Sequence, residues 1–557
     1  MRTVIALALT VSVLLVWILH RPQLLRDILR SKGPFAPGGY AGKPTESTQT
    51  EGAIVSHMRA CTGILWVRSG SSGRVTDLDL VAANLSVLSD QVVLVTSDGD
   101  RDVPSSYGDR TVRAILESPK ITRWLTQNYD GTIVHPKLRA IPIGLDVHTK
   151  GHTKAAVARA VSERTALPTR RMGPLCCFMS PSHPERAAMM ETIRDNPTVA
   201  FDTHRRTFDE TMRLYTRYRF VLSPRGNGLD CHRTWEALLA GCIVITRTSP
   251  LDAMYARNRL PVVVIGEWDE LNVDTRNKLA QWEAWYGPLT ADGVLMPKMR
   301  FAYWVAPALV VGGTARDCAP FLPGVFERLD ALSAGRRVYY AFYESNSADD
   351  TLEQLRAFVA ARDGIVFTER TRGSRTERIA RGRNAIVSHV ESAAYDFFVN
   401  LDLDDRCQFD VRSVRECIAR AHEWDVATSN RTGEYYDRWA LRTGAMGDMY
   451  DGAAHCIVDS TAIGAACAPA PPISAWFPGD AELEGKTTFP RNGAYRRVLS
   501  AFGGLSIYKA GLMRGARYAG TGASGAPECE HVPFHAAIRK RFPNTRIVIA
   551  PYLISGP

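Results

Sequence analysis

The chain has 557 residues, of which 45% are apolar and 23% charged, a composition typical of globular proteins and not of disordered ones. One hydrophobic core does not serve a chain of this length, so about three compact units are expected. The formal net charge of +10 favours acidic ligands, but no block of Lys and Arg is interleaved with aromatic residues, so no nucleic-acid partner is predicted.

An apolar segment from Thr3 to Leu19 opens the chain. It lies at the short end for a membrane-spanning helix and is followed by no small-x-small cleavage site, so residues 1–32 are predicted to be an uncleaved signal anchor. Residues 33–54, rich in Gly, Pro, Ser and Thr, are predicted to be a flexible stem. Basic residues follow the apolar segment more often than they precede it, which by the positive-inside rule favours a cytosolic C-terminal side.

Short apolar runs alternate with helical patterns between residues 55 and 330. A helix is predicted over residues 111–128, and strands are predicted at 64–67, 92–96, 140–144, 175–179, 220–223, 242–246 and 262–265. This alternation predicts parallel sheets with helices on both faces, divided near residues 150–173 into two Rossmann-like lobes with a cleft between them. Asp146 and His148 follow a predicted strand on the cleft side, so either is a candidate general base.

The segment Phe220–Thr246 combines the features of an anion-binding site. A strand is followed by the glycine-containing loop Pro224–Gly228 and then by a helix that carries Arg233 and Glu236. Loop N–H groups and a helix N-terminus bind anions, and Arg225 and Arg233 can hold a diphosphate bidentately, while Glu236 can accept hydrogen bonds from ribose hydroxyls. Alternatively, Arg233 and Glu236 form an ordinary i,i+3 surface pair and the glycines only shape turns.

The run S-P-x-G-x-G followed by C-H-R-x-x-E-A-L-x-x-G-C-I, from Ser223 onward, resembles the nucleotide-binding lobe of exostosin-like GT-B glycosyltransferases. The resemblance implies a two-lobed GT-B domain over residues 55–330 that transfers a sugar from a nucleotide-sugar donor without a metal. It also implies that the donor is bound by Arg225, Gly226, Arg233 and Glu236.

A second acidic motif ends the apolar run that begins at Tyr395. The triplet Asp402-Leu403-Asp404 places two carboxylates at i and i+2 of a strand end, where their side chains point to the same side. Such a pair can hold a hard divalent cation, Mn²⁺ or Mg²⁺, and the cation can hold a diphosphate. Two alternatives remain: the triplet is a solvated acidic turn, or Asp405 takes the metal role of Asp404.

Other patterns of this half surround the acidic triplet in sequence. An aromatic strand is predicted at 338–343, with an acidic loop to residue 350 and a helix over 350–362. A further helix begins at Arg378 and carries Arg383 and Asn384, although this basic run can also be a solvated helix face. Towards the end of the chain come the segments Gly503-Gly-Leu-Ser-Ile-Tyr508 and Glu528-Cys-Glu-His-Val-Pro-Phe-His535.

This order of motifs resembles GT-A glycosyltransferases, particularly the fungal capsule-associated mannosyltransferase type. The resemblance implies a GT-A domain over residues 337–557, in which Asp402 and Asp404 contact the metal and the donor, and Arg383 and Asn384 lie near the donor. It implies Mn²⁺ or Mg²⁺ as the cofactor of this domain, with His531 or His535 completing the metal ligands. From the residues alone, a histidine beside a proline turn is more often a packed side chain than a ligand.

Together the two resemblances imply an α/β enzyme with a GT-B domain followed by a GT-A domain behind an N-terminal transmembrane helix. The expected function is glycosyl transfer from nucleotide sugars to a glycan or glycoprotein acceptor, by a single-pass type II protein of the Golgi or ER lumen. Two alternatives are a protein with one catalytic domain and one carbohydrate-binding or scaffold module, and a non-enzymatic membrane-tethered interaction protein. Neither the donor sugar nor the stereochemical outcome follows from the sequence.

Overall fold

The computed structural model describes residues 28–31, 49–70, 75–360, 362–391, 395–404, 408–431, 435, 437, 440–442, 491, 493–522, 525 and 527–556. Within this part of the chain no helix is both long and apolar enough to cross a membrane. The predicted signal-anchor segment from Thr3 to Leu19, and Asp405, lie outside the described residues, as does most of the predicted stem.

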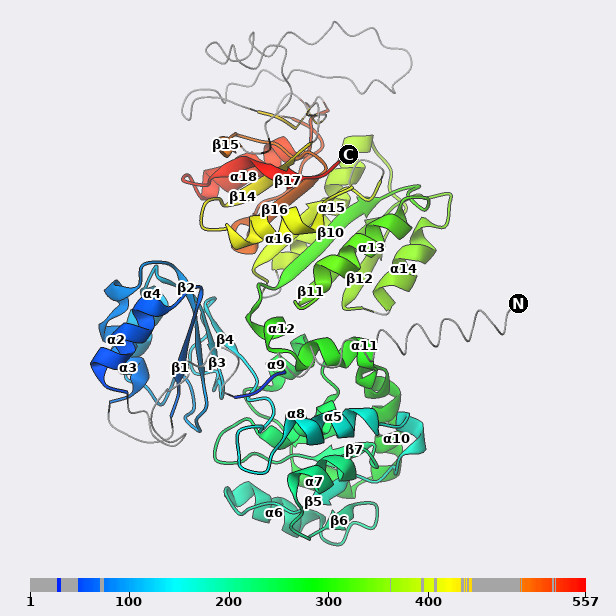
Figure 1. Cartoon of the computed structure of the whole chain (residues 1–557). Coiled ribbons are helices and arrows are strands. Elements are labelled where there is room, and N and C mark those ends of the chain that lie inside the picture. The colour runs from blue at the N-terminus through cyan, green and yellow to red at the C-terminus, as the bar shows by residue number, and fades with distance from the viewer. Residues whose placement is uncertain are drawn as a thin grey trace, which may run out of the picture. The chain divides into compact units, whose positions relative to one another are not determined.

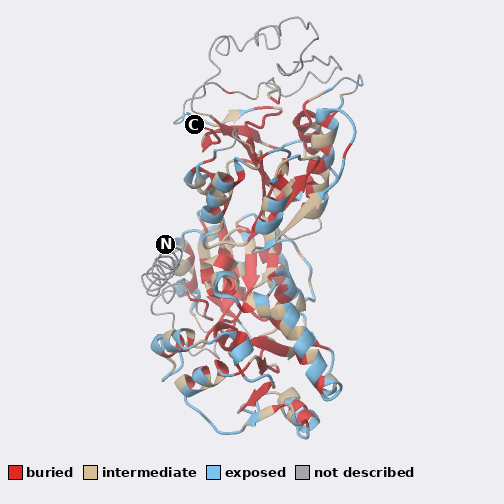
Figure 2. Ribbon diagram, turned by 90° about the vertical axis from the view of Figure 1, so that its right-hand side faces the viewer, coloured by how far each residue is buried: buried red, intermediate tan, exposed pale blue. Residues whose placement is uncertain are grey.

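The chain divides into two compact units, Met1–Val305 and Ala306–Pro557. Each has its own sheets and cores, and buried residues concentrate on the strands and on the helix faces that cover them (Figure 2). The boundary precedes the predicted one near residue 330, because the strand Leu309–Ala315 pairs with strands of the second unit.

Unit 1 begins with a four-stranded parallel sheet in the order β1-β2-β3-β4 (Figure 1). Its strands are β1 (Ile64–Arg68), β2 (Val92–Ser97), β3 (Ile121–Thr126) and β4 (Leu138–Ala140). Its helices are α2 (Glu51–Ala60), α3 (Asp77–Ala83) and α4 (Asp109–Glu117). The helix predicted over 111–128 is wrong in its second half: Pro119 follows the end of α4, and the β-branched and aromatic run after it forms β3.

A second parallel sheet in unit 1 has five strands in the order β6-β5-β7-β8-β9. The strands are β5 (Leu175–Cys177), β6 (Ala200–Asp202), β7 (Phe220–Leu222), β8 (Ile243–Arg247) and β9 (Val262–Ile265). The accompanying helices are α5 (Lys154–Ser162), α6 (Pro184–Ile193), α7 (Phe208–Tyr215), α8 (His232–Leu239), α9 (Asp252–Arg257), α10 (Thr275–Tyr286), α11 (Asp292–Leu295) and α12 (Phe301–Val305). The predicted division of this region into two sets of parallel strands is confirmed.

The chain order of this second sheet reverses beside β5. The chain passes from β5 to β6 on one side and then returns to place β7 on the other side of β5. At such a switch point the loops that leave the two neighbouring strands diverge, and ligands of open α/β sheets bind in the crevice outside these strand ends. The loops after Cys177 and Leu222 therefore define the favoured ligand position of this sheet.

Unit 2 contains one mixed sheet in the order β12-β11-β10-β13-β16-β14-β17-β15. The strands are β10 (Leu309–Ala315), β11 (Val338–Glu344), β12 (Gly364–Thr368), β13 (Phe397–Leu401), β14 (Val426–Asn430), β15 (Arg496–Arg497), β16 (Leu505–Lys509) and β17 (Ile547–Ile554). The first four strands in space run parallel, and β16 runs antiparallel to both β13 and β14. The helices are α13 (Leu322–Ser333), α14 (Thr351–Ala360), α15 (Arg375–Glu391), α16 (Val411–Ala419) and α18 (His531–Arg541).

Both faces of this sheet are covered, because alternate side chains of a strand point to opposite faces. Leu309 and Val311 of β10 share a core with α13, α14 and α16, which Figure 1 shows over one face. Val310 shares the opposite core with α15 and α18. The strand order reverses beside β10: β11 and β12 lie on one side and β13 on the other. The carboxyl ends of β10 and β13 therefore form the switch point of unit 2.

Candidate functional site

Asp402 and Asp404 lie directly after β13, at the switch point of unit 2. The backbone N–H of Asp402 donates to the carbonyl oxygen of Gly504, which extends the pairing of β13 with β16 by one residue. Leu403 is buried between the two half-buried acidic residues. The Asp-Leu-Asp triplet therefore stands at the strand end that the sequence predicted, with its apolar residue turned into the core.

Arg383 of α15 links this strand end to the start of α18. The guanidinium is 4% exposed and donates to Glu530 Oε1 at 3.0 Å, to Asn400 Oδ1 at 2.6 Å and to Asp402 Oδ1 at 3.2 Å. It also lies over the ring of Phe502, 4.7 Å from the centroid. Arg383 is therefore not part of a solvated helix face; it fixes the position of the Asp402 carboxylate.

Burial and neighbouring carboxylates make this cluster resist ionisation. Burial raises the pKa of Asp402 to about 7; the positive charge of Arg383 opposes this effect, and the charges of Asp404, Asp437 and Glu530 add to it. Burial likewise raises the pKa of Asp437 to about 6, against hydrogen bonds such as that from the backbone N–H of Gly503. A site of this kind gains from a cation, because a positive charge favours the ionised carboxylates.

Asn384 follows Arg383 on α15 and performs a structural task. Its Nδ2 donates to the carbonyl oxygen of Tyr518 at 2.9 Å, and its Oδ1 accepts from the backbone N–H of Tyr518 at 2.8 Å. The ring of Tyr518 stacks on Phe534 and its hydroxyl lies 3.3 Å from Asn400 Nδ2. Asn384 therefore orders the segment around Tyr518 beside the cluster, and both ends of its amide are engaged within the protein.

The two candidate histidines of α18 have opposite surroundings. His535 is fully buried; its Nδ1 lies 2.9 Å from Ser500 Oγ and its Nε2 lies 2.9 Å from Tyr508 Oη, and burial lowers its pKa to about 3. Both of its ring nitrogens are occupied, so His535 is a packed residue. His531 is equally buried and stacks on Phe502, but neither ring nitrogen has a hydrogen-bond partner, and its Nε2 lies 3.6 Å from Glu530 Oε1.

The residues at this strand end offer atoms that can bind a divalent cation, but they do not form a complete set of ligands around one. The unpartnered ring nitrogens of His531 are the kind of buried polar atoms that a ligand satisfies. Among the described residues, however, Asp402, Asp404 and His531 do not bring their ligand atoms within 4.8 Å of one another. Mg²⁺ and similar cations are commonly held by one or two carboxylates together with substrate phosphates, so two protein ligands suffice for such a site.

In unit 1 the loop Pro224–Gly228 lies at the switch point between β5 and β7. Arg186 of α6 holds this loop: its Nε donates to the carbonyl oxygen of Arg225 at 3.0 Å and its Nη1 to that of Ser180 at 2.8 Å. A side chain at Gly226 would meet Arg186 Nη2 at 3.0 Å, so glycine leaves room for this clamp. No sequence pattern pointed to Arg186, because α6 and the loop come together only in the fold.

The two predicted phosphate ligands of this loop region are incompletely satisfied within the protein. Arg225 donates from Nη2 to the carbonyl oxygen of Asn227 at 3.2 Å, and its buried Nε has no hydrogen-bond partner. Arg233 donates from Nη2 to the carbonyl oxygen of Phe178 at 3.0 Å, and its buried Nε and Nη1 have none. Guanidinium groups in this state have donors left for an anion.

Glu236 lies one turn after Arg233 and is buried. Because Glu236 is buried and Arg233 is half-buried, the two side chains are not an ordinary i,i+3 pair on the surface. Burial raises the pKa of Glu236 to about 7, helped by the charge of Asp146, while Arg233 and the backbone N–H of Asp146 oppose this effect. The hydrogen bond to Asp146 engages the carboxylate that was expected to meet ribose hydroxyls.

Asp230, which the sequence did not single out, fixes the start of α8. Its buried carboxylate accepts hydrogen bonds from the backbone N–H groups of Ile143 at 2.7 Å and Cys231 at 2.9 Å, and from Trp235 Nε1. Burial raises its pKa to about 6 despite these bonds. Asp230 thereby ties the segment that leads to Asp146 to the helix that carries Arg233 and Glu236.

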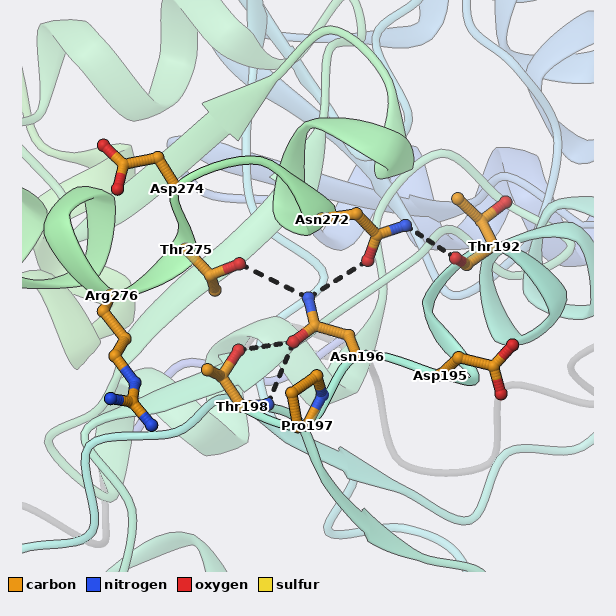
Figure 3. Close-up of a pocket in the computed structure, with 9 residues that line it drawn as sticks. All are labelled: Thr192, Asp195, Asn196, Pro197, Thr198, Asn272, Asp274, Thr275 and Arg276. Atoms are coloured by element: carbon orange, nitrogen blue, oxygen red, sulfur yellow. Dashed lines mark hydrogen bonds between the residues drawn. The ribbon is translucent and has the colours of Figure 1, made fainter.

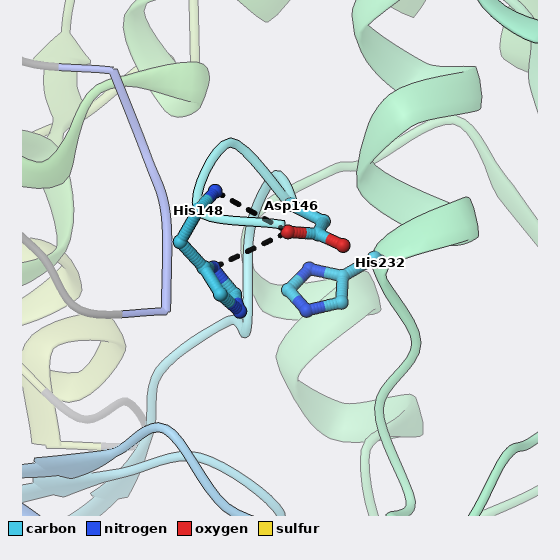
Figure 4. Close-up of side chains that lie close together, drawn as sticks. All are labelled: Asp146, His148 and His232. Atoms are coloured by element: carbon cyan, nitrogen blue, oxygen red, sulfur yellow. Dashed lines mark hydrogen bonds and ion pairs between the residues drawn. The ribbon is translucent and has the colours of Figure 1, made fainter. Parts of the chain in front are cut away.

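Asp146 and His148, the candidate bases, lie in the loop after Leu145 and next to His232 of α8 (Figure 4). His148 Nδ1 lies 3.3 Å from Asp146 Oδ1. The three side chains offer one ligand atom each within 4.8 Å of one another.

A pocket in unit 1 lies apart from these residues. It is lined by residues 192 and 195–198 near the end of α6 and by residues 272 and 274–276 at the start of α10 (Figure 3). Its central amide, Asn196, donates to the carbonyl oxygen of Leu271 and accepts from the backbone N–H of Thr198. Its polar groups thus satisfy one another, and no residue proposed for donor binding lines it.

Comparisons with known proteins give distant structural matches. No family model matches the chain, and neither does any curated protein sequence. Among the solved structures, residues 1–349 of TarS from S. aureus match at 11% identity and a TM-score of 0.27, over 45% of this chain and 60% of that one. The mannosyltransferase PcManGT from Pyrobaculum calidifontis, in complex with GDP-Man and Mn²⁺, matches at 12% identity and a TM-score of 0.27, over 46% of this chain and 59% of that one.

Glucosyl-3-phosphoglycerate synthase from Mycobacterium tuberculosis, in complex with Mg²⁺ and uridine-diphosphate, matches at 14% identity and a TM-score of 0.27, over 45% of this chain and 70% of that one. The chain spans about 60% of the length of the TarS fragment and of PcManGT, and 37% of the longer TarS chain. At these identities and TM-scores the matches establish neither a family nor an activity for this chain.

Proposed function

We propose that this protein transfers glycosyl groups from nucleotide-sugar donors, with a GT-A-type, cation-dependent donor site in unit 2. The observation that carries the proposal is the position of Asp402 and Asp404 at the carboxyl end of β13, at the switch point of the sheet. There the buried Arg383 donates a hydrogen bond to Asp402. A solvated acidic turn would not need such a partner.

Each residue of the unit 2 site has a separate task in this proposal. Asp402 and Asp404 would hold Mn²⁺ or Mg²⁺ together with the diphosphate of the donor, and a movement of the His531 side chain would bring its unpartnered ring nitrogen to the same ion. When bound, the cation neutralises the negative charge that develops on the departing diphosphate. Arg383 keeps the Asp402 carboxylate aligned and compensates part of the charge of the carboxylate cluster. Asn384 holds the Tyr518 segment in place.

For unit 1 we propose a second, anion-binding donor site of GT-B type. It rests on Arg225 and Arg233, whose unpartnered buried nitrogens lie on the loop and helix that leave the β5–β7 switch point. Gly226 leaves room for Arg186 to hold the loop, and Glu236 supports the segment at Asp146. Two donor sites in one chain make a bifunctional transferase.

We further propose that the acceptor is a glycan or glycoprotein and that residues 1–32 anchor the protein in the Golgi or ER membrane, with the catalytic units in the lumen. This placement rests on the apolar segment from Thr3 to Leu19 and on the glycosyltransferase activity proposed for the two donor sites.

A donor-hydrolysis screen tests the proposal. The full chain is incubated with UDP- and GDP-sugars, with Mn²⁺ or with a chelator, alongside Asp402→Asn and Arg225→Gln. We expect one activity that is lost with the cation or with Asp402→Asn, and a second that is lost only with Arg225→Gln. Asp330→Asn and Glu191→Gln, on exposed side chains of units 2 and 1, are the matched controls.

A single activity that responds to one variant would leave the other unit a binding or scaffold module. Absence of turnover, together with absence of binding of any nucleoside diphosphate, would overturn the transferase proposal and leave a non-enzymatic interaction protein.

A further inference from the structure

We propose that unit 1 contains a divalent transition-metal site held by Asp146, His148 and His232. Asp146 and His148 come from the loop after Leu145 and His232 from the first turn of α8, and in Figure 4 the three side chains face one another. This site borders the proposed donor site of unit 1, because Glu236 accepts a hydrogen bond from the backbone N–H of Asp146, and it lies in the unit for which the sequence predicted no metal.

The distances suit a common metal. One ligand atom from each of the three residues lies within 4.8 Å of the other two. The distance from His148 Nδ1 to Asp146 Oδ1 is 3.3 Å. In a tetrahedral zinc site with bonds of about 2.0 Å, neighbouring ligand atoms are about 3.3 Å apart. No pair in the set is farther apart than 4.8 Å, so at most a small side-chain rotation closes the set around an ion.

One ring nitrogen of His232 is engaged within the protein. Its Nδ1 lies 2.7 Å from the carbonyl oxygen of Gly144, so this nitrogen carries the proton and Nε2 keeps its lone pair. A ligating histidine usually donates its other ring N–H to a carbonyl or carboxylate in this manner.

The Asp146 carboxylate is held in place by the backbone of its own loop. Its Oδ1 accepts hydrogen bonds from the backbone N–H groups of His148 at 3.3 Å and Thr149 at 3.1 Å. A third imidazole is close by, with His152 Nδ1 lying 3.1 Å from Asp146 Oδ2.

The donor set selects the class of ion. Two imidazole nitrogens and one carboxylate suit Zn²⁺ and its neighbours Co²⁺ and Ni²⁺, whereas Mg²⁺ and Ca²⁺ prefer oxygen ligands throughout. His148 is exposed and Asp146 and His232 are only partly buried. Three protein ligands and access from solvent leave a coordination position for water or a substrate oxygen, as in catalytic zinc sites.

The alternative is a metal-free network in which His148 and Asp146 are joined by hydrogen bonds alone. His148 also lies near Ser31, with 3.4 Å between Nδ1 and Oγ, so hydrogen bonds alone can hold it. Metal binding distinguishes the two, since a hydrogen-bonded network binds no transition metal.

The test uses the full chain, purified without a polyhistidine tag and stripped with EDTA. Zn²⁺ affinity is measured by competition with a chromophoric chelator, and Co²⁺ binding by its visible absorption. We expect His148→Ala and His232→Gln each to lower the affinity for one equivalent of Zn²⁺ by at least about tenfold. We also expect both variants to lose the corresponding Co²⁺ absorption band. His204→Ala, whose side chain is 84% exposed elsewhere in unit 1, should leave both unchanged.

An equivalent that survives in both variants belongs to another site and does not support this one. Equal Zn²⁺ stoichiometry and affinity in the wild type and His148→Ala would overturn the proposal. Thermal melting in EDTA checks that both variants remain folded.

Discussion

The substitution Glu236→Gln tests the electrostatics of unit 1 most directly. Burial is the main reason that the pKa of Glu236 rises from its ordinary 4.5 to about 7. The folded protein therefore keeps the proton on Glu236 at pH values where the unfolded chain has released it. The stability contributed by the protonated form is complete below about pH 4.5 and is lost as pH rises through about 7.

The shift of about 2.5 pH units corresponds to a cost of about 3 kcal/mol for the ionised carboxylate. Glutamine has the same shape, carries no charge and can still accept the hydrogen bond from the backbone N–H of Asp146. We therefore expect Glu236→Gln to stabilise unit 1 by about 3 kcal/mol at pH 8 and by less than about 1 kcal/mol at pH 5.

Hydrogen-exchange mass spectrometry in EDTA reads this effect locally, from peptides that cover α8 and β8 in the full chain. Glu191→Gln, at an exposed position of α6, is the control. It should change the local stability by no more than about 0.5 kcal/mol at either pH. If Glu236→Gln changes the stability equally at pH 5 and pH 8, or lowers it at pH 8, the assignment of Glu236 as a buried, destabilising carboxylate is refuted.

Three further predictions concern unit 2. Calorimetry should find that Mn²⁺ and UDP or GDP bind more tightly as pH rises from 6 to 8, because Asp402, whose pKa is raised to about 7 chiefly by burial, must ionise to bind the cation. Asp402→Asn should bind them weakly at every pH. A wild-type affinity that does not change with pH would contradict the role of Asp402. Arg383→Met should destabilise β13 and α15 by about 3–5 kcal/mol in hydrogen exchange, because the carboxylates of Glu530 and Asp402 lose their partner. Arg362→Met removes a partly exposed pair with Asp330 and should cost at most about 1 kcal/mol. Gly382→Ala should cost about 1–3 kcal/mol in thermal or urea unfolding, because the new Cβ would meet Tyr343 Cδ1 at 2.5 Å; a neutral result would mean that α15 can shift.

Local patterns in the sequence predicted much of the fold. Buried strands of parallel sheets are short apolar runs, so β1, β2, β5, β7, β8 and β9 could be placed within one or two residues. The aromatic run at 338–343 and the acidic triplet after β13 were also placed correctly. The error over 111–128 arose because a helix and a strand of similar hydrophobicity are separated there by only a few residues, with Pro119 as the signal.

The sequence by itself determined that strand-end carboxylates follow β13 and that a glycine loop with two arginines follows β7, because each motif is contiguous. Only the tertiary structure decided what these groups meet. Arg383 joins Asp402 to Glu530 across more than a hundred residues of chain, and His232 lies close to Asp146 although the two belong to separate segments. His531 and His535 share one helix and equal burial, yet Ser500 and Tyr508 satisfy only His535. Hydrogen-bond partners and burial arise from the packing of distant segments, and no local pattern encodes them.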